Sequence, residues 1–220
     1  IFTIITHELK NNARMGGTGG HVFPLLNIAQ YIKKNSPEIS FHWVGEAQSI
    51  ESKVSSENDI PFSSITCGKL RRYFSLQNLL MPFQVLMGIV QSIVILQREK
   101  PTAIFSKGGY VSLPVAVTSW ILGIPVYLHE SDSIPGLTNK VVGRFASGIF
   151  CAFSEADSFF ETSKILGHGS LLSNEILSLT NEVIPPNPEP KYLSRVDPGS
   201  ASVFDAVIEL LPRFSDVDFH

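Results

Sequence analysis

Two kinds of hydrophobic pattern alternate along most of the chain. Short runs rich in β-branched and aromatic residues predict strands, and longer segments with apolar residues at every third or fourth position predict helices. The expected strands are 1–6, 40–44, 61–66, 103–106, 125–128 and 148–153, and the expected helices are 22–34, 111–122, 137–145 and a long one that ends at Arg98. Strands separated by helices form right-handed βαβ units, so the predicted fold class is α/β, with a Rossmann-like, doubly wound parallel sheet.

The alternation weakens toward the end of the chain. One more strand is expected at 163–167, and four prolines between Pro185 and Pro190 are typical of a linker. Residues 191–211 then have the pattern of a strand, a turn and a helix, and the chain stops too early to complete a domain of ordinary size. We therefore expect a first domain at 1–166, a linker at 167–190 and the incomplete start of a second domain at 191–220.

The long helix has an unusual distribution of polar residues. No charged residue occurs from Tyr73 to Gln97, which is long enough for a membrane-spanning helix. A polar stripe with seven-residue spacing consists of Gln77, Gln84, Gln91 and Arg98. Because these side chains share one helix face and are costly in lipid, we expect an amphipathic helix that packs on the sheet or lies at a membrane surface. A spanning helix is the alternative.

The loop before this helix contains three cations, Lys69, Arg71 and Arg72. Cations beside an apolar helix are typical of a contact with an anionic membrane surface. A solvated loop ahead of a core helix is an equally good interpretation of the same residues.

Composition narrows the function classes. The chain of 220 residues is 44% hydrophobic and 17% charged, which excludes a disordered protein. The net charge of −3 provides no positive field for nucleic-acid binding. Cys67 and Cys151 are far apart and lack C-x-x-C spacing, so neither a disulfide framework nor a zinc site is expected. A reducing compartment is the simplest interpretation.

The candidate chemistry lies in loops that follow the predicted strands, since these loops gather at the ligand-binding edge of a parallel sheet. In Gly16–His21, four glycines surround Thr18 directly before a helix, so backbone N–H groups could hold a phosphate. The loop matches neither G-x-G-x-x-G nor the Walker A pattern, and a flexible turn is the alternative. His21 could accept a proton from a hydroxyl nucleophile or could simply cap or pack the helix.

Three further loops reach the same edge. Lys107–Tyr110 contains a second pair of glycines. The group His129, Glu130 and Asp132 is weak evidence for a metal, and a helix cap or hydrogen bonds to a ligand are favoured. Ser154 and Asp157 have the spacing of a capping box.

Three of these segments together resemble the MurG family. They are Gly16–Pro24, Gly108–Ser112, and His129–Glu130 with Pro135–Lys140. The resemblance extends from about Gly16 to Phe160, as judged from motif order and spacing. MurG proteins are peripheral membrane glycosyltransferases that transfer N-acetylglucosamine from UDP-N-acetylglucosamine to undecaprenyl-diphosphoryl-N-acetylmuramoyl-pentapeptide, converting lipid I to lipid II in peptidoglycan synthesis. The resemblance implies the N-terminal acceptor half of a GT-B fold, located at the cytoplasmic face of the bacterial membrane.

The resemblance also implies roles for individual residues. His21 would be the catalytic base or an orienting group. The implied substrate-binding residues are Thr18, Gly19, Gly20, Gly108, Gly109, Tyr110, Glu130, Asp132, Asn139 and Ser200. The implied membrane contacts are Lys69, Arg71, Arg72, Leu76, Leu80 and Phe83. The implied partners are the undecaprenyl lipid and an anionic membrane surface, with UDP-N-acetylglucosamine as donor substrate and neither a cofactor nor a metal.

Several segments depart from the family pattern. Residues 7–15 are inserted before the first glycine loop, and Asp132 replaces a usual asparagine. Gly167–Leu171 stands in place of Gly-Asn-Pro-Val-Arg, and Asp197–Ala201 in place of a Gly-Gly-Ser-Gln-Gly loop, where Ser200 is one of two matches. Because these departures affect the donor side, the alternative is a non-catalytic half that binds a lipid diphosphate and needs a separate donor-binding chain.

A dinucleotide-binding oxidoreductase is a third and weaker interpretation. It is disfavoured because the chain lacks G-x-G-x-x-G and an acidic residue at a clear end of the second strand.

Overall fold

The computed structural model describes residues 2–5, 22–67 and 77–169. In chain order the elements are β1 Phe2–Ile5, α1 Val22–Asn35, β2 Phe41–Gly45, α2 Ile50–Glu57, β3 Phe62–Ser64, α3 Gln77–Glu99, β4 Ala103–Ser106, α4 Ser112–Leu122, β5 Val126–Glu130, α5 Leu137–Phe145, β6 Gly148–Cys151, the 3₁₀ helices η1 Ser154–Phe159 and η2 Thr162–Lys164, and β7 Ile165–His168. Strands and helices therefore alternate, as the hydrophobic pattern predicts.

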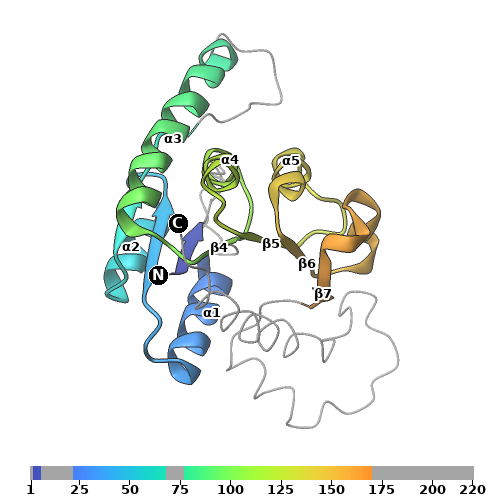
Figure 1. The fold of residues 1–220 in the computed structure, drawn as a ribbon, viewed down its shortest axis with the longest axis horizontal. Helices are drawn as coiled ribbons and strands as arrows, with labels where there is room; N and C mark the ends of the chain where they lie inside the picture. The colour runs from blue at the N-terminus through green and yellow to red at the C-terminus, as the bar shows by residue number, and fades with distance from the viewer. Residues whose placement is uncertain (1, 6–21, 68–76, 170–220) are drawn as a thin grey trace, which may run out of the picture.

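All seven strands are parallel and form one sheet in the order β3-β2-β1-β4-β5-β6-β7 (Figure 1). The chain first moves outward from β1 through β2 to β3, and then crosses back to place β4 on the other side of β1. The strand order therefore reverses between β1 and β4. The predicted α/β, doubly wound parallel sheet is confirmed.

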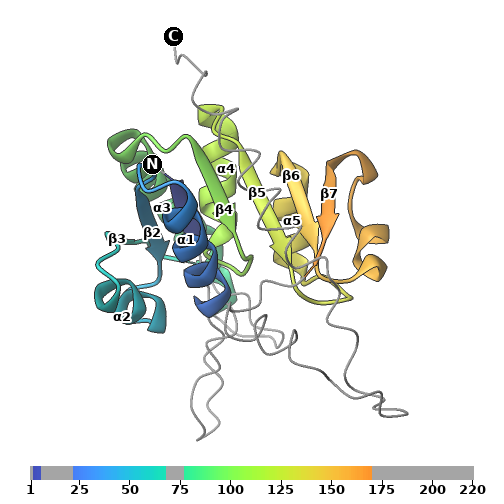
Figure 2. The ribbon, with the colours of Figure 1, turned by 90° about the horizontal axis from the view of Figure 1, so that it is seen from below.

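The helices cover both faces of the sheet. Figures 1 and 2 show α1 on one face and α4 and α5 on the other. Successive residues of β4 point to opposite faces of the sheet. On one face Phe105 packs with the α1 residues Leu25 and Ile28. On the other face Ile104 packs with Leu96 of α3 and Val115 of α4. The core is thus divided by the sheet into two layers.

Three elements differ from the sequence-based expectations. Helix α2 was not predicted, and it begins where the side chain of Ser49 accepts a hydrogen bond from the N–H of Ser52 at 3.3 Å. Strand β5 extends to Glu130, two residues beyond the expected end, because its polar last residues are buried. Strand β7 continues to His168, so the sheet extends past the expected boundary at 166.

The predicted capping box at Ser154 and Asp157 is wrong. The turn there is a 3₁₀ helix with no side-chain hydrogen bond at its cap. The Asp157 carboxylate instead contacts Nε2 of His168, with both oxygens at 2.9 Å. The Asp157 carboxylate therefore interacts with His168 of β7 and does not cap the 3₁₀ helix.

Helix α3 turns part of its polar stripe toward the protein. The side-chain amide of Gln91 accepts a hydrogen bond from Thr66 N at 2.6 Å and donates one to Thr66 Oγ1 at 3.3 Å. Arg98 donates to Ser63 Oγ at 3.1 Å. Gly88 lies against the Thr66 carbonyl and Pro114, where a β-carbon would not fit. The polar stripe therefore anchors α3 to the segment around β3.

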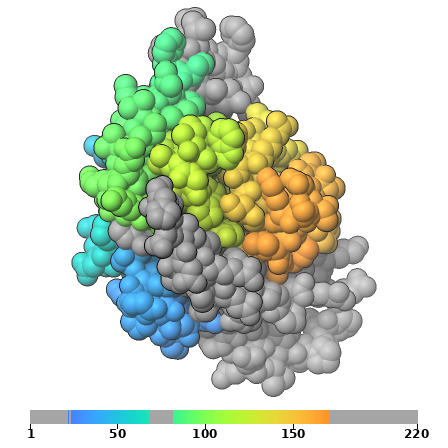
Figure 3. Space-filling model, viewed as in Figure 1, coloured from blue at the N-terminus to red at the C-terminus, as the bar shows by residue number. Residues whose placement is uncertain are grey.

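The outward face of α3 is apolar. Its exposed residues are Phe83, Leu86, Met87, Val90 and Val94. In the space-filling view α3 forms a green ridge along one side of the molecule, beside α4 (Figure 3). No helix in the described part of the chain combines the length and the apolar character needed to cross a membrane.

Candidate functional site

The turn after β4 is held by side chains that lie within and beyond it. Ser106 Oγ donates a hydrogen bond to Ser112 Oγ at 2.7 Å and accepts one from Gly108 N at 3.1 Å. Gly108 and Gly109 have φ angles of +90° and +87°, which favour glycine. These two glycines define what we call the glycine turn.

Asn139 joins the glycine turn to the segment after β5. Its Oδ1 accepts a hydrogen bond from Gly109 N at 3.1 Å, and its Nδ2 donates to Glu130 Oε2 at 2.8 Å. The other oxygen of Glu130 accepts from Asp132 N at 2.8 Å. Glu130 is 3% exposed and Asn139 is 9% exposed, so both side chains belong to the interior. The glycine turn is therefore a fixed structure whose own N–H groups are already engaged.

Tyr110 reaches across the sheet to the end of β2. Its hydroxyl donates to Glu46 Oε2 at 2.5 Å. Burial and this carboxylate raise the pKa of Tyr110, so the phenol stays protonated. The expectation that no acidic residue follows the second strand is wrong, because β2 continues to Gly45 and places Glu46 directly after it. Sequence reasoning missed Glu46 because the strand was expected to end at Val44.

A buried chain of hydrogen bonds lies beside the glycine turn. Lys107 Nζ is 2.8 Å from His129 Nδ1, and His129 Nε2 is 3.0 Å from the Gly169 carbonyl oxygen. Burial lowers the pKa of Lys107 to about 8, against the opposing effect of Glu130 and Asp132. Burial and the neighbouring Lys107 lower the pKa of His129. His129 is therefore neutral, with the proton on Nε2, because an ammonium group can only donate to Nδ1.

Several predicted site residues lie outside the described residues. They are Thr18, Gly19, Gly20, His21, Ser200, Lys69, Arg71, Arg72 and Leu76. Leu80 falls within the backbone of α3, and the side chain of Phe83 is 70% exposed on that helix. The structure brings together Gly108, Gly109, Glu130, Asp132 and Asn139, with Tyr110 reaching from the same turn toward β2.

The described residues support neither a metal-binding site nor a reactive cysteine. These ranges contain no group of three or more His, Cys, Asp or Glu side chains arranged to hold a metal ion. Burial raises the pKa of both the Cys67 and Cys151 thiols to about 12, which keeps them protonated and unreactive.

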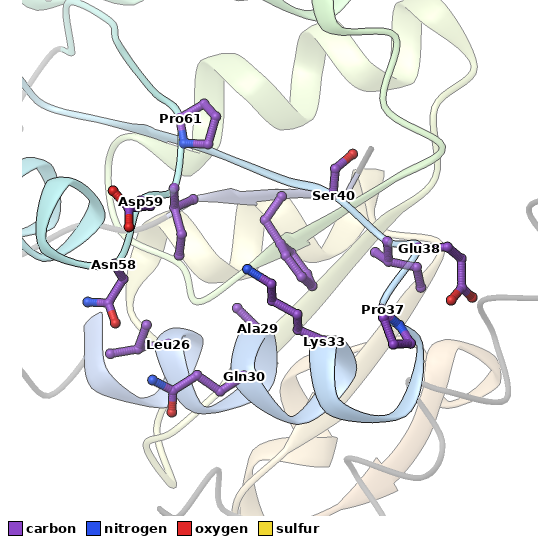
Figure 4. A pocket seen from close by; sticks show the side chains of 13 residues that line it. Leu26, Ala29, Gln30, Lys33, Pro37, Glu38, Ser40, Asn58, Asp59 and Pro61 are labelled. Atoms are coloured by element: carbon purple, nitrogen blue, oxygen red, sulfur yellow. The ribbon is translucent and has the colours of Figure 1, made fainter.

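An open pocket of about 510 Å³ lies at the opposite edge of the sheet (Figure 4). It is lined by α1, by the start of β2 and by the segment between α2 and β3; its polar residues include Lys33, Glu38 and Asp59. Since ligands of open α/β sheets bind outside the carboxyl ends of the strands, this pocket is separate from the candidate site.

Comparisons with known proteins bear on the family and the fold of the chain. Residues 14–151 match the glycosyltransferase family 28 N-terminal domain. Over 167 residues the chain is 45% identical to a UDP-N-acetylglucosamine–N-acetylmuramyl-(pentapeptide) pyrophosphoryl-undecaprenol N-acetylglucosamine transferase 3 of Bacillus thuringiensis (strain Al Hakam). This alignment covers 76% of the chain and 47% of that protein, so the chain spans about half the length of the curated relatives it matches.

Comparison with solved structures confirms the fold. A crystal structure of MurG from Acinetobacter baumannii matches with a TM-score of 0.62 and 25% identity, over 79% of this chain and 46% of that one. A UDP-GlcNAc 2-epimerase from Methanocaldococcus jannaschii matches with a TM-score of 0.54 and 16% identity, over 75% of this chain and 45% of that one. The second likeness concerns the fold alone.

Proposed function

Because the chain belongs to glycosyltransferase family 28, we propose that it forms the acceptor-binding half of a MurG-type N-acetylglucosaminyltransferase. The reaction is transfer of N-acetylglucosamine from UDP-N-acetylglucosamine to undecaprenyl-diphosphoryl-N-acetylmuramoyl-pentapeptide. The observation that carries the proposal is 45% identity to a transferase of that name over 76% of the chain. The fixed glycine turn at the carboxyl edge supports it, because this edge is where open α/β sheets bind ligands.

The chemistry requires a base and a site for the diphosphates. An acceptor hydroxyl displaces UDP from the donor sugar, and a base removes the hydroxyl proton. We assign this role to His21, with Thr18, Gly19 and Gly20 facing a diphosphate through their N–H groups. Gly108, Gly109 and Tyr110 line the acceptor side. Glu130 and Asn139 hold that side in shape through their hydrogen bonds, and Asp132 and Ser200 complete the binding set.

The acceptor is a lipid, so the chain must meet a membrane surface. The exposed apolar face of α3 supports this role, with Phe83 at 70% exposure and Val90 at 52%. Lys69, Arg71 and Arg72 precede the helix and add attraction to anionic headgroups. Leu76 and Leu80 extend the apolar contact. We therefore infer peripheral association with the cytoplasmic face of the bacterial membrane, through one helix face and one basic loop.

The half-length alignment favours a second candidate for the isolated chain. A GT-B enzyme binds the sugar nucleotide mainly with the half that the alignment does not cover. In this candidate the 220-residue chain captures a lipid diphosphate and transfers sugar only with a separate donor-binding chain.

One experiment tests both candidates. The purified chain is assayed with UDP-N-acetylglucosamine and a soluble lipid I analogue, alone and with the separately expressed C-terminal half of the Bacillus thuringiensis relative. We expect binding of the lipid I analogue and little or no transfer by the chain alone. Turnover near one per second, in the ordinary enzyme range, would show that the chain is a complete enzyme. Absence of binding to the lipid I analogue would contradict the acceptor role.

A further inference from the structure

Lys107 is a buried cation that has few partners. It directly precedes the glycine turn and is 3% exposed. An ammonium group has three N–H donors, and His129 Nδ1 is the acceptor at 2.8 Å. Among the described residues, no carboxylate forms an ion pair with Lys107. A buried charge without an ion pair is costly, and the nearby Glu130 and Asp132 offset only part of that cost.

The partner of Lys107 connects three strands. Lys107 follows β4, His129 lies in β5, and the Gly169 carbonyl that accepts the His129 proton follows β7. Gly169 N in turn donates to the Cys151 carbonyl at the end of β6, at 2.9 Å. The hydrogen-bond chain therefore ties the position of the glycine turn to the far side of the sheet.

Resting on the proposed function, we propose that Lys107 is a positioning residue for the diphosphate of the acceptor: it supplies a buried positive charge beside the glycine turn and fixes that turn against the end of β7 through His129. The charge acts through space, because the N–H groups of Gly108 and Gly109 are engaged within the turn. In a poorly hydrated site a single charge within a side-chain length changes anion affinity by about tenfold.

The charges around Lys107 determine how this residue titrates. Glu130 at the end of β5 and Asp132 just after that strand favour the protonated form of Lys107, and burial disfavours it, with a resulting pKa of about 8. His129 remains neutral beside it. Farther along the edge are the protonated Cys151 thiol and the His168–Asp157 pair. A bound diphosphate adds negative charge, so its binding near pH 8.5 should draw a proton onto Lys107.

The test is a calorimetric titration of the 220-residue chain with farnesyl diphosphate, in two buffers of different ionisation enthalpy, at pH 7.0 and 8.5. A parallel titration with inorganic pyrophosphate separates the diphosphate from the prenyl chain. We expect the wild-type chain to take up part of a proton on binding at pH 8.5. Lys107→Met should bind about tenfold more weakly and take up no proton. Lys107→Arg should keep its affinity within about threefold, without proton uptake, because arginine is always charged.

Lys100→Met is the matched control, because Lys100 is an exposed lysine before β4 and loses the same charge. It should leave affinity and proton uptake unchanged. If Lys107→Met binds farnesyl diphosphate as the wild type does, this inference is wrong while the proposed function stands. If the wild-type chain binds neither probe, this inference is wrong, and binding of the lipid I analogue decides separately on the proposed function. If Lys107→Met does not fold, the test is the proton uptake of the wild type and of Lys107→Arg on binding at pH 7.0 and 8.5. Equal proton uptake by these two proteins would overturn the inference.

Discussion

A β-carbon on Gly108 would collide with the side-chain amide of Asn139. The same amide accepts a hydrogen bond from the next residue, Gly109, at 3.1 Å. The backbone of the turn therefore approaches Asn139 as closely as only glycine permits. The packing of α5 against the turn therefore requires glycine at position 108, and the positive φ angles favour glycine at both 108 and 109.

Gly108→Ala should therefore destabilise the domain more than an alanine at another left-handed glycine. Gly123 is the control, since its φ is +72° and a β-carbon there would meet nothing within 4 Å. We expect Gly123→Ala to cost about 1 kcal/mol of unfolding free energy, and Gly108→Ala about 1–3 kcal/mol more, because of the collision with Asn139. Urea unfolding of both variants measures the difference. Equal losses would show that the turn yields to a β-carbon.

Asn139→Ala removes a donor and an acceptor from the interior. Gly109 N and Glu130 Oε2 then lose their partners, and each buried polar group left unpaired costs about 1–3 kcal/mol. Asn35→Ala is the control, because the side chain of Asn35 also donates a hydrogen bond, to Tyr31 O at 2.8 Å, but at an exposed position. Its cost should stay within about 0.5 kcal/mol. Similar unfolding midpoints for the two variants would contradict the role assigned to Asn139.

Val90→Glu should weaken membrane binding without affecting the fold. Val90 is 52% exposed on the apolar face of α3, and insertion of its side chain into lipid contributes about 1.5 kcal/mol or more. Gln84→Glu adds the same charge to an exposed position of the polar stripe. Co-sedimentation with phosphatidylglycerol vesicles should show at least about a tenfold loss for Val90→Glu and a smaller one for Gln84→Glu.

Salt and carbonate extraction then distinguish the kinds of association. High salt screens the basic loop, and carbonate removes peripheral proteins, so either treatment should release the wild-type chain. Retention after both treatments would contradict peripheral association, and equal binding by the two glutamate variants would exclude the α3 face.

The stability of the domain should rise with pH between 8 and 10.5 through Lys107. Burial lowers the pKa of Lys107 from 10.5 to about 8, so in this interval the unfolded chain binds more protons than the folded one. Unfolding free energy therefore increases with pH, by up to about 3 kcal/mol for a shift of this size. Since the cysteine thiols titrate in the opposite sense, the measured quantity is the difference between wild type and Lys107→Met. A difference that does not change with pH would mean that Lys107 is not buried as a cation.

Local pattern predicted some elements to the residue and missed others for identifiable reasons. Ala103–Ser106 and Leu137–Phe145 were predicted with their observed bounds, because apolar runs there are bounded by proline or glycine. Helix α2 was missed because Ile50 and Val54 are its only large apolar residues, too few to show a helical period.

The contacts within the candidate site could not be predicted from the local sequence pattern alone. Tyr110 and Glu46 are separated by 64 positions in the sequence, and their contact depends on β1 lying between β2 and β4.

The resemblance to a known family implies which residues form the site, but it does not predict the contacts among them. Gly109, Glu130 and Asn139 are predicted to touch substrate, and the structure adds that they are linked to one another through hydrogen bonds of the Asn139 side chain. For Lys107 the sequence predicts only its place as the first residue of a loop. Its contact with His129 depends on the register between β4 and β5 and on which face each side chain occupies, neither of which local sequence specifies.

The position of β1 has a consequence for synthesis on the ribosome. Of the seven described strands β1 is synthesised first, yet it lies in the middle of the sheet, where Phe2 pairs with Phe41 on one side and Ala103 on the other. Until β4 has left the ribosome, one edge of β1 lacks its native partner and is open to pairing with other chains. Pairing across so long a stretch of sequence is slow. The strand reversal at the proposed ligand-binding edge therefore forms late, so we expect the nascent chain to bind a ligand there only after the step that also pairs the open edge of β1.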